Sequence, residues 1–341
     1  MDTSPESHPY AALTPDVILD AVDSTGFQSN GRFLALNSYE NRVYQIGLET
    51  SESGVDLESA PEFVVAKFYR PDRWSDEAIQ EEHDFTLDLA EQEIPVVAPL
   101  RSEDGRTLHY YNDFRFSICP RRGGRGPDLN LAEHRKWMGR FIGRIHALGA
   151  TSDFKHRPAI TIDAFVIEPK IFLLQQKILP PYLEEVYSDL VDQATGLIQQ
   201  RYEMAGHVQN IRLHGDCHAG NVLWTDQGPH FVDFDDSRMG PAIQDLWMML
   251  SGQQDEMIAQ LTDLLEGYQR FYRFNESELH LIEALRTMRI INYAAWLAKR
   301  WSDPAFPAAF PWFDNPRFWE EHILSLREQI ALLQENTVVL Y

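Results

Sequence analysis

Two short polar clusters, joined by a predicted hairpin, constrain this chain of 341 residues more than any other part of its sequence. The first cluster contains Asp216 and, five residues later, Asn221. The second begins at Asp233, which ends an apolar run. Between them, two segments of strand composition flank the turn-forming residues 225–229. The pattern predicts a tight β-hairpin with an amide at its start and a carboxylate at its end.

These oxygen-bearing side chains are typical of a protein that transfers phosphoryl groups. Such transfer needs mainly positioning and charge stabilisation, so we expect Asp216 to orient an attacking hydroxyl and accept its proton. Asn221 and Asp233 offer the hard oxygen ligands that Mg²⁺ prefers, with Asp233 bridging metal and phosphates. An Asp and an Asn at this spacing also occur by chance in polar loops, but the preceding His214-Gly215 and the hairpin disfavour chance.

Zinc is the alternative metal for the first cluster, because His214, Cys217 and His218 lie beside Asp216. Zinc sites usually draw on two separated pairs of ligands, and here all candidates lie in one five-residue stretch. The sequence therefore favours magnesium. We expect His214 to be a buried support of the loop, hydrogen-bonded to backbone.

Lys67 ends an apolar strand, where a charge needs a partner unless the strand lies at a surface edge. The functional interpretation has Lys67 contact the α- and β-phosphates of a nucleotide and pair with a helical Glu. Glu82 is the best partner, because it falls on the same helical face as several apolar residues, and Glu81 is the fallback. Ser38, in a turn without glycine, is either a phosphate contact or an ordinary turn residue.

Other polar and aromatic residues have mainly structural interpretations. Asp245 is expected to anchor the loop after the metal site. Asp235 and Asp236 are expected near the metal without being its first ligands. The aromatic residues of 301–307 and 310–312 either cap a core or line a substrate groove.

Periodicity along the chain predicts an α+β fold in two lobes. A first domain, residues 1–120, begins with a polar tail (1–9) and combines an antiparallel sheet with one main helix and a polar loop at 49–61. Its expected strands are 33–36, 42–46, 62–69, 95–100, 108–111 and 114–119, and its helices start at Thr14 and Ser75. A second domain, residues 121–341, is mostly helical and includes the hairpin. Its expected helices are 128–149, 166–178, 181–205, 242–251, 254–273, 277–301 and 316–336.

Charge and composition narrow the classes of partner. A net charge of −22 opposes binding to nucleic acid, which needs a basic face, and fits either plain solubility or a cationic substrate. No apolar run reaches the roughly 18 residues of a membrane span. The N-terminus lacks a signal-peptide pattern, and two cysteines cannot form a disulfide framework. We therefore expect a cytoplasmic protein, and a monomer.

The chain resembles the bacterial stress response kinase A family, within the aminoglycoside phosphotransferase and choline kinase superfamily of the protein-kinase-like fold. The likeness is carried by residues 36–45, 65–71, 213–224, 245–247 and 301–306. It implies that Asp216 is the proton acceptor, that Asn221 and Asp233 bind magnesium, and that Ser38 contacts ATP. It also implies that Lys67 and Glu82 form the ion pair that clamps the phosphates. Phosphorylation of Ser and Thr in proteins, autophosphorylation and a role in stress follow from the resemblance alone.

The sequence departs from typical protein kinases in three places: the first hairpin lacks glycines, His-Gly-Asp replaces His-Arg-Asp, and Asp-Phe-Asp-Asp replaces Asp-Phe-Gly. The Arg that grips a phosphorylated activation loop is thus missing. Three hypotheses stand: a Ser/Thr protein kinase, a kinase of small alcohols such as aminoglycosides, choline or homoserine, and an inactive pseudokinase scaffold. Intact Lys67, Asp216, Asn221 and Asp233 argue against the last.

Overall fold

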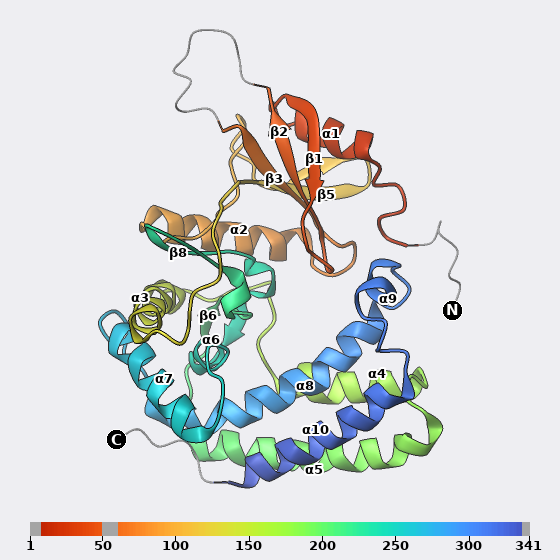
Figure 1. The fold of residues 1–341 in the computed structure, drawn as a ribbon, viewed down its shortest axis with the longest axis vertical. Coiled ribbons are helices and arrows are strands. Elements are labelled where there is room, and N and C mark those ends of the chain that lie inside the picture. Colours follow the sequence, from red (N-terminus) through yellow and green to blue (C-terminus); the bar gives the residue numbers. More distant parts are fainter. Residues whose placement is uncertain (1–7, 50–60, 336–341) are drawn as a thin grey trace. The chain divides into compact units, whose positions relative to one another are not determined.

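The computed structural model of this protein describes residues 8–49 and 61–335, which form two compact units (Figure 1). Unit 1 comprises residues 1–127, 155–157 and 220–235, and unit 2 comprises the rest. The hairpin that the sequence grouped with the second domain thus makes its contacts within unit 1. The predicted domain boundary at residue 120 stays a prediction. Most of the predicted polar tail and of the 49–61 loop lie outside the described residues.

Unit 1 contains the predicted antiparallel sheet, whose strands follow the order β1-β2-β3-β5-β4. The strands are β1 Ser29–Ala35, β2 Arg42–Leu48, β3 Phe63–Phe68, β4 His109–Tyr111 and β5 Phe114–Pro120. In the central strand β3, Lys67 pairs with Val43 on one side and with Ser117 on the other. A lysine at this register is flanked by strands on both sides, so it is not at an edge.

Two helices complete unit 1, α1 Pro15–Asp23 and α2 Asp76–Glu91. Each begins at a predicted cap: the hydroxyl of Thr14 accepts from the Val17 amide, and that of Ser75 accepts from the Ala78 amide. The apolar face of α1 packs on alternate residues of β2, β3 and β5. Sheet and caps agree with the sequence because each rests on local residue patterns.

The predicted hairpin is also present, as β7 Val222–Thr225 paired with β8 Gly228–Phe231. The predicted strand at 95–100 was wrong, since that segment makes only a single bridge, from Val96 to Phe231. Pro95 and Pro99 explain the difference, because proline has no amide to donate to a strand ladder.

Unit 2 is mostly helical, as predicted. Its helices are α3 Ala132–Gly149, α4 Glu168–Gln175, α5 Glu184–Ala205, α6 Ile243–Trp247, α7 Gln254–Tyr268, α8 Ile282–Lys299, α9 Ala305–Ala309 and α10 Pro316–Gln334. Short single turns are a π-helix at Asp163–Ile167 and 3₁₀ turns at Pro181–Leu183 and Glu276–Leu281; two more, Ala219–Asn221 and Phe234–Asp236, flank the hairpin. The sequence missed α9 and the short sheet of β6 Ile211–Leu213 with β9 Arg238–Gly240. Within the described residues, no helix is long and apolar enough to cross a membrane.

Helices α3 and α7 approach each other closely because glycines line their contact. A Cβ atom added at Gly139 would lie 1.8 Å from the carbonyl oxygen of Leu264. One added at Gly267 would lie 2.1 Å from the carbonyl oxygen of Lys136. Any side chain at these positions therefore forces the two backbones apart.

We predict that Gly139→Ala lowers the free energy of unfolding by about 2 kcal/mol, because overpacking a tight contact forces backbone shifts. Gly196→Ala, in the middle of α5, is the matched control, since its added Cβ meets nothing within 4 Å. There the exchange should stabilise the helix by about 0.5–1 kcal/mol. Denaturant titration of both variants measures the difference, and equal effects would refute the tight contact.

Candidate functional site

The ammonium group of Lys67 lies among three carboxylates of unit 1. Its Nζ is 3.0 Å from Asp235, 3.4 Å from Asp233 and 3.5 Å from Glu82. The lysine side chain is only 13% exposed, so it is held inside the unit and does not extend into solvent. Burial alone lowers the pKa of Lys67, but the carboxylates of Asp235, Glu82 and Asp233 raise it well above its usual value. Lys67 is therefore a fixed positive charge.

Glu82, and not Glu81, is the partner of Lys67 on α2. Glu82 is buried on the face of the helix that also buries Ala78, Phe85 and Leu89. Its second oxygen accepts a hydrogen bond of 2.9 Å from Arg157. Burial raises the pKa of Glu82, an effect that Lys67 and Arg157 oppose. The sequence predicted the correct glutamate as the partner of Lys67, because Glu82 lies on the apolar face of α2.

Glu81, the fallback, has a structural role instead. Its carboxylate accepts from the backbone amides of Lys155, His156 and Arg157 at 2.6 to 3.0 Å. It thus fastens the short segment that delivers Arg157 to Glu82. Glu81 and Glu82 therefore both bind the segment 155–157. Glu81 binds its backbone amides, and Glu82 binds the side chain of Arg157.

Asn221 and Asp233 flank the hairpin, where the Val232 amide donates to the backbone oxygen of Asn221 at 3.0 Å. Asp233 has a left-handed backbone (φ 61°), which few residues other than glycine adopt, and its side chain is 55% exposed. Among the described residues, no three His, Cys, Asp or Glu side chains are placed to bind a metal together. An amide and a carboxylate oxygen fit a magnesium ion that takes its other ligands from phosphates and water.

Asp235 is the residue of unit 1 whose importance the sequence underestimated. It is buried, and besides Lys67 it binds Arg73 and accepts a hydrogen bond of 2.9 Å from Asn41. Burial would raise the pKa of Asp235, but the charges of Arg73, Lys67 and Arg157 hold it below its usual value. Its position two residues after Asp233 was the only signal in the sequence, because its partners lie far away along the chain.

Asp216 belongs to unit 2, where two cationic or polar partners hold its carboxylate. Arg289 of α8 is 2.8 Å from Oδ1, and His218 is 3.4 Å from Oδ2. Burial would raise the pKa of Asp216, but the hydrogen bond from His218 and the charge of Arg289 hold it well below its usual value. The group is thus a carboxylate at neutral pH. Sequence analysis missed Arg289, which has no motif around it.

The loop before Asp216 is fixed by Asp245 of α6. The buried carboxylate of Asp245 accepts from the amides of His214 (2.8 Å) and Gly215 (2.9 Å) and from His146 (3.0 Å). The expectation that Asp245 anchors a loop was correct in kind, but the loop is the one that precedes Asp216. His214 is fully buried, and its ring faces the Asp216 amide, as predicted.

Gly215 is required in this loop for two reasons. Its φ is +86°, and a Cβ there would lie 2.1 Å from the backbone oxygen of Asp236. Cys217 is buried, and burial raises the pKa of its thiol well above the usual value.

Helix α6 is itself held at its first residue by Glu278. The Glu278 carboxylate accepts from the amide of Ile243 at 2.9 Å and is only 4% exposed. Burial raises the pKa of Glu278 to about 7. A chain of contacts therefore runs from Glu278 through α6 and Asp245 to the loop of Asp216.

The remaining predicted residues have simpler surroundings. Ser38 lies half-buried in the turn between β1 and β2. Phe306 is fully buried and packs on Trp296 with ring centroids 5.1 Å apart, and Trp301 packs on Phe313 at 4.9 Å. Phe306 therefore belongs to the core of unit 2, as the first of the two interpretations had it, whereas Trp312 is 42% exposed.

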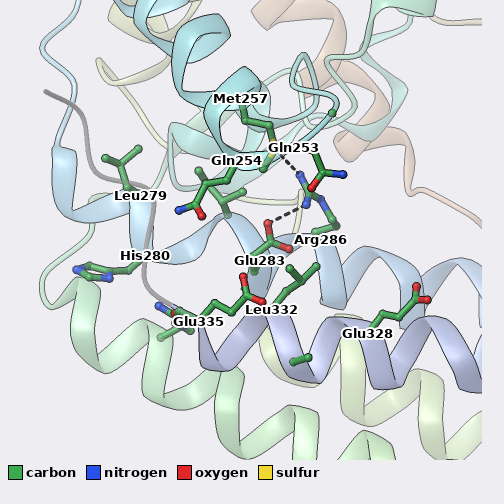
Figure 2. Close-up of a pocket in the computed structure, with 14 residues that line it drawn as sticks. Gln253, Gln254, Met257, Leu279, His280, Glu283, Arg286, Glu328, Leu332 and Glu335 are labelled. Carbon is green, nitrogen blue, oxygen red and sulfur yellow. Dashed lines mark hydrogen bonds and ion pairs between the residues drawn. The ribbon is translucent and has the colours of Figure 1, made fainter.

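A cavity of about 540 Å³ in unit 2 is formed by residues other than the predicted ones (Figure 2). It lies at the start of α8, where Glu283 forms an ion pair of 2.7 Å with Arg286. Arg286 also lies 5.4 Å from the ring centroid of Trp247 on α6. The candidate site therefore rests on the chemistry of its side chains and not on this cavity.

Comparisons with known proteins agree with the fold and the residue pattern. Residues 33–282 match the phosphotransferase enzyme family. A structure described as amicoumacin kinase hAmiN in complex with AMP-PNP, Ca²⁺ and Ami has a TM-score of 0.64. Its identity to this chain is 19%, over 88% of this chain and 90% of that one. The predicted protein-kinase-like fold is thus confirmed.

Curated relatives are more similar. Stress response kinase A of Escherichia coli K12 is 41% identical over 96% of this chain and 95% of its own. The serine/threonine protein kinase RdoA of Salmonella typhimurium is 39% identical over the same shares. This chain therefore belongs to the phosphotransferase enzyme family and, within it, to the stress response kinase A family. The predicted class, a kinase, is confirmed.

We predict that Arg157→Met lowers the free energy of unfolding by about 3 kcal/mol or more, because it leaves Glu82 buried without its closest cation. The same change deprives the carbonyls of Ala78 and Asp235 of a donor. Arg317→Met, which breaks an exposed pair with Glu321, should cost less than about 0.5 kcal/mol. Chemical denaturation of the two variants tests this, and a cost at Arg157 as small as that at Arg317 would contradict it.

We also predict a pH signature for Glu278. The folded pKa of about 7 lies above the usual 4.5, so protonated Glu278 favours the folded state. This stabilisation is fully present below about pH 4.5 and is lost as pH rises through about 7. The free energy of unfolding of wild type minus that of Glu278→Gln should therefore fall by about 3 kcal/mol across that interval. Glu276→Gln, an exposed neighbour, is the control, and parallel curves for wild type and Glu278→Gln would exclude the shift.

Proposed function

We propose that this protein transfers the γ-phosphoryl group of ATP to Ser and Thr hydroxyls of proteins, with Mg²⁺ as its metal. The observation that supports this most is the buried cluster of Lys67, Glu82, Asp233 and Asp235, combined with membership of a kinase family. A buried cation beside the carboxylate of Asp233 suits the triphosphate of a nucleotide and its metal. We further propose a monomer that acts in the cytoplasm, where ATP is present.

The nucleotide is assigned to unit 1. Lys67 contacts the α- and β-phosphates, and Glu82 holds its ammonium group in place from the other side. The Ser38 hydroxyl and the amides of its turn contact phosphate oxygens. Asn221 and Asp233 hold the metal, which when bound neutralises charge on the β- and γ-phosphates.

Asp216 acts on the acceptor. Its carboxylate accepts a hydrogen bond from the acceptor hydroxyl and orients the oxygen toward the γ-phosphorus. That oxygen forms the new P–O bond as the bond to ADP breaks, and the hydroxyl proton passes to Asp216 late in the reaction. The lowered pKa of Asp216 makes it a weak base, which fits orientation better than early deprotonation.

Protein acceptors are proposed because curated relatives that are 39% to 41% identical are named stress response kinase A and serine/threonine protein kinase RdoA. The family relation also motivates a role in stress. A small-alcohol kinase is the second candidate, because the structural neighbour hAmiN is described as an amicoumacin kinase in complex with AMP-PNP, Ca²⁺ and Ami. An inactive scaffold is disfavoured by the intact cluster around Lys67.

Labelled ATP decides among the three. The protein is incubated with Mg²⁺, [γ-³²P]ATP and either a protein acceptor such as casein or a panel of aminoglycosides, choline and homoserine. Label on protein supports the proposal, and label only on a small alcohol supports the second candidate. If wild type transfers no more label than the Asp216→Asn variant does, the inactive scaffold is the supported candidate.

We predict that Asp216→Asn lowers kcat by about 10³-fold while ATP binding changes little, because it removes a group that acts only during transfer. The change keeps side-chain size, so the loop held by Asp245 should persist. Asp226→Asn, in the exposed hairpin turn, is the matched control and should retain full activity. Steady-state kinetics and calorimetry with ATP check both, and a kcat near wild type in Asp216→Asn would remove its assigned role.

A further inference from the structure

We infer that Arg289 and the exposed face of α8 beyond it form an acceptor-binding surface that selects Ser or Thr next to acidic residues. The surface consists of Arg289, Tyr293, Trp296 and Arg300, and is named here the α8 surface. The inference rests on the proposed function, because it takes Asp216 as the group that receives the acceptor hydroxyl.

The charge of α8 is opposite to that of the chain as a whole. The full sequence has 52 acidic against 30 basic residues. Residues 284–302 nevertheless contain four basic residues, Arg286, Arg289, Lys299 and Arg300, and no Asp or Glu. A basic segment in so acidic a protein attracts acidic partners and is disfavoured for cationic ones.

One of these cations touches the proposed base directly. Arg289 lies 2.8 Å from Oδ1 of Asp216, and its side chain is 45% exposed. A guanidinium has five N–H donors, so it can hold Asp216 and still bind a second carboxylate on its open side. A carboxylate bound there would lie beside the carboxylate that receives the acceptor hydroxyl. The acceptor would thus be oriented by a charge close to its reacting oxygen.

The adjoining residues suit a peptide better than a small alcohol. Tyr293 and Trp296 follow Arg289 by four and seven residues, so the three share one face of the helix. The two rings stack with centroids 5.7 Å apart, and Tyr293 is 39% exposed. The guanidinium of Arg300 lies 5.2 Å from the Trp296 ring centroid. The α8 surface therefore has, along one face, an exposed cation, the exposed ring of Tyr293, the half-buried ring of Trp296 and the half-buried cation of Arg300.

Arg286 is not part of this surface. It is paired with Glu283 at 2.7 Å and lies over Trp247, so its charge is used within unit 2. Arg289, in contrast, is a basic residue of α8 that contacts the proposed base, Asp216. Figure 1 shows helix α8 running toward α9.

The test uses three peptides with one Ser each, flanked by Glu, by Ala or by Lys. With the full-length protein and MgATP, we expect kcat/KM to be at least about tenfold higher for the Glu-flanked peptide than for the Ala-flanked one. Arg289→Ala should reduce that preference to less than about twofold, mainly through KM for the acidic peptide. Arg289→Lys should keep part of it, and Arg289→Glu should shift the preference to the Lys-flanked peptide.

A binding measurement separates this inference from the proposed function. Fluorescence anisotropy with a labelled Glu-flanked peptide, its Ser replaced by Ala, reports on the α8 surface without any transfer. We expect binding that weakens with salt, and that is lost in Arg289→Ala and reduced in Tyr293→Ala. Arg317→Ala, an exposed arginine of α10, is the matched control and should bind like wild type.

The outcomes are distinct. If wild type transfers phosphate to protein without preference for acidic flanks, or if Arg289→Ala keeps that preference, the inference is wrong and the proposed function stands. If wild type phosphorylates no peptide, the proposed function fails, and the binding measurement alone decides the inference. Equal affinity for the Glu- and Ala-flanked peptides in that measurement would overturn it.

Discussion

The ion pairs of the buried Lys67 are the interactions on which unit 1 depends. A buried ammonium is tolerated only when carboxylates surround it, and those carboxylates in turn need cations. Glu82 receives Arg157, and Asp235 receives Arg73 and Asn41. These partners come from the sheet, α2, the segment 155–157 and the end of the hairpin, so the ion network joins parts of unit 1 that are far apart in the sequence. Asp233, by contrast, has a side chain that is 55% exposed.

In unit 2, the loop before Asp216 is held mainly through its backbone amides. Asp245 binds two consecutive amides just before Asp216, and Glu278 binds the start of the helix that carries Asp245. Backbone groups are fixed partners, so the loop keeps its path whatever the state of the exposed residues nearby. Arg289 and His218 then set the charge and direction of the Asp216 carboxylate. The buried Asp245 and Glu278 thus fix the position of the loop, and the more exposed Arg289 and His218 lower the pKa of Asp216.

Local patterns in the sequence predicted most of the fold and the core of the site. Lys67 and Glu82 could be paired because an apolar strand and an apolar helical stripe each contained one charge. The strand at 95–100 was predicted wrongly from composition, although its prolines opposed it. The three-residue strands β6 and β9 are too short for any periodicity, and α9 has only five residues. Arg73, Arg157 and Arg289 act through partners more than 70 residues away, and no single sequence reveals such pairs.

Gly215 has a consequence for how this enzyme is controlled. Its backbone conformation and the oxygen of Asp236 beside it leave no room for any side chain, least of all an arginine. Typical protein kinases place an arginine here, which senses a phosphate added to their own activation segment. The packing around Gly215 therefore leaves no place for that sensor, and the loop before Asp216 is held instead through its backbone amides by the buried Asp245.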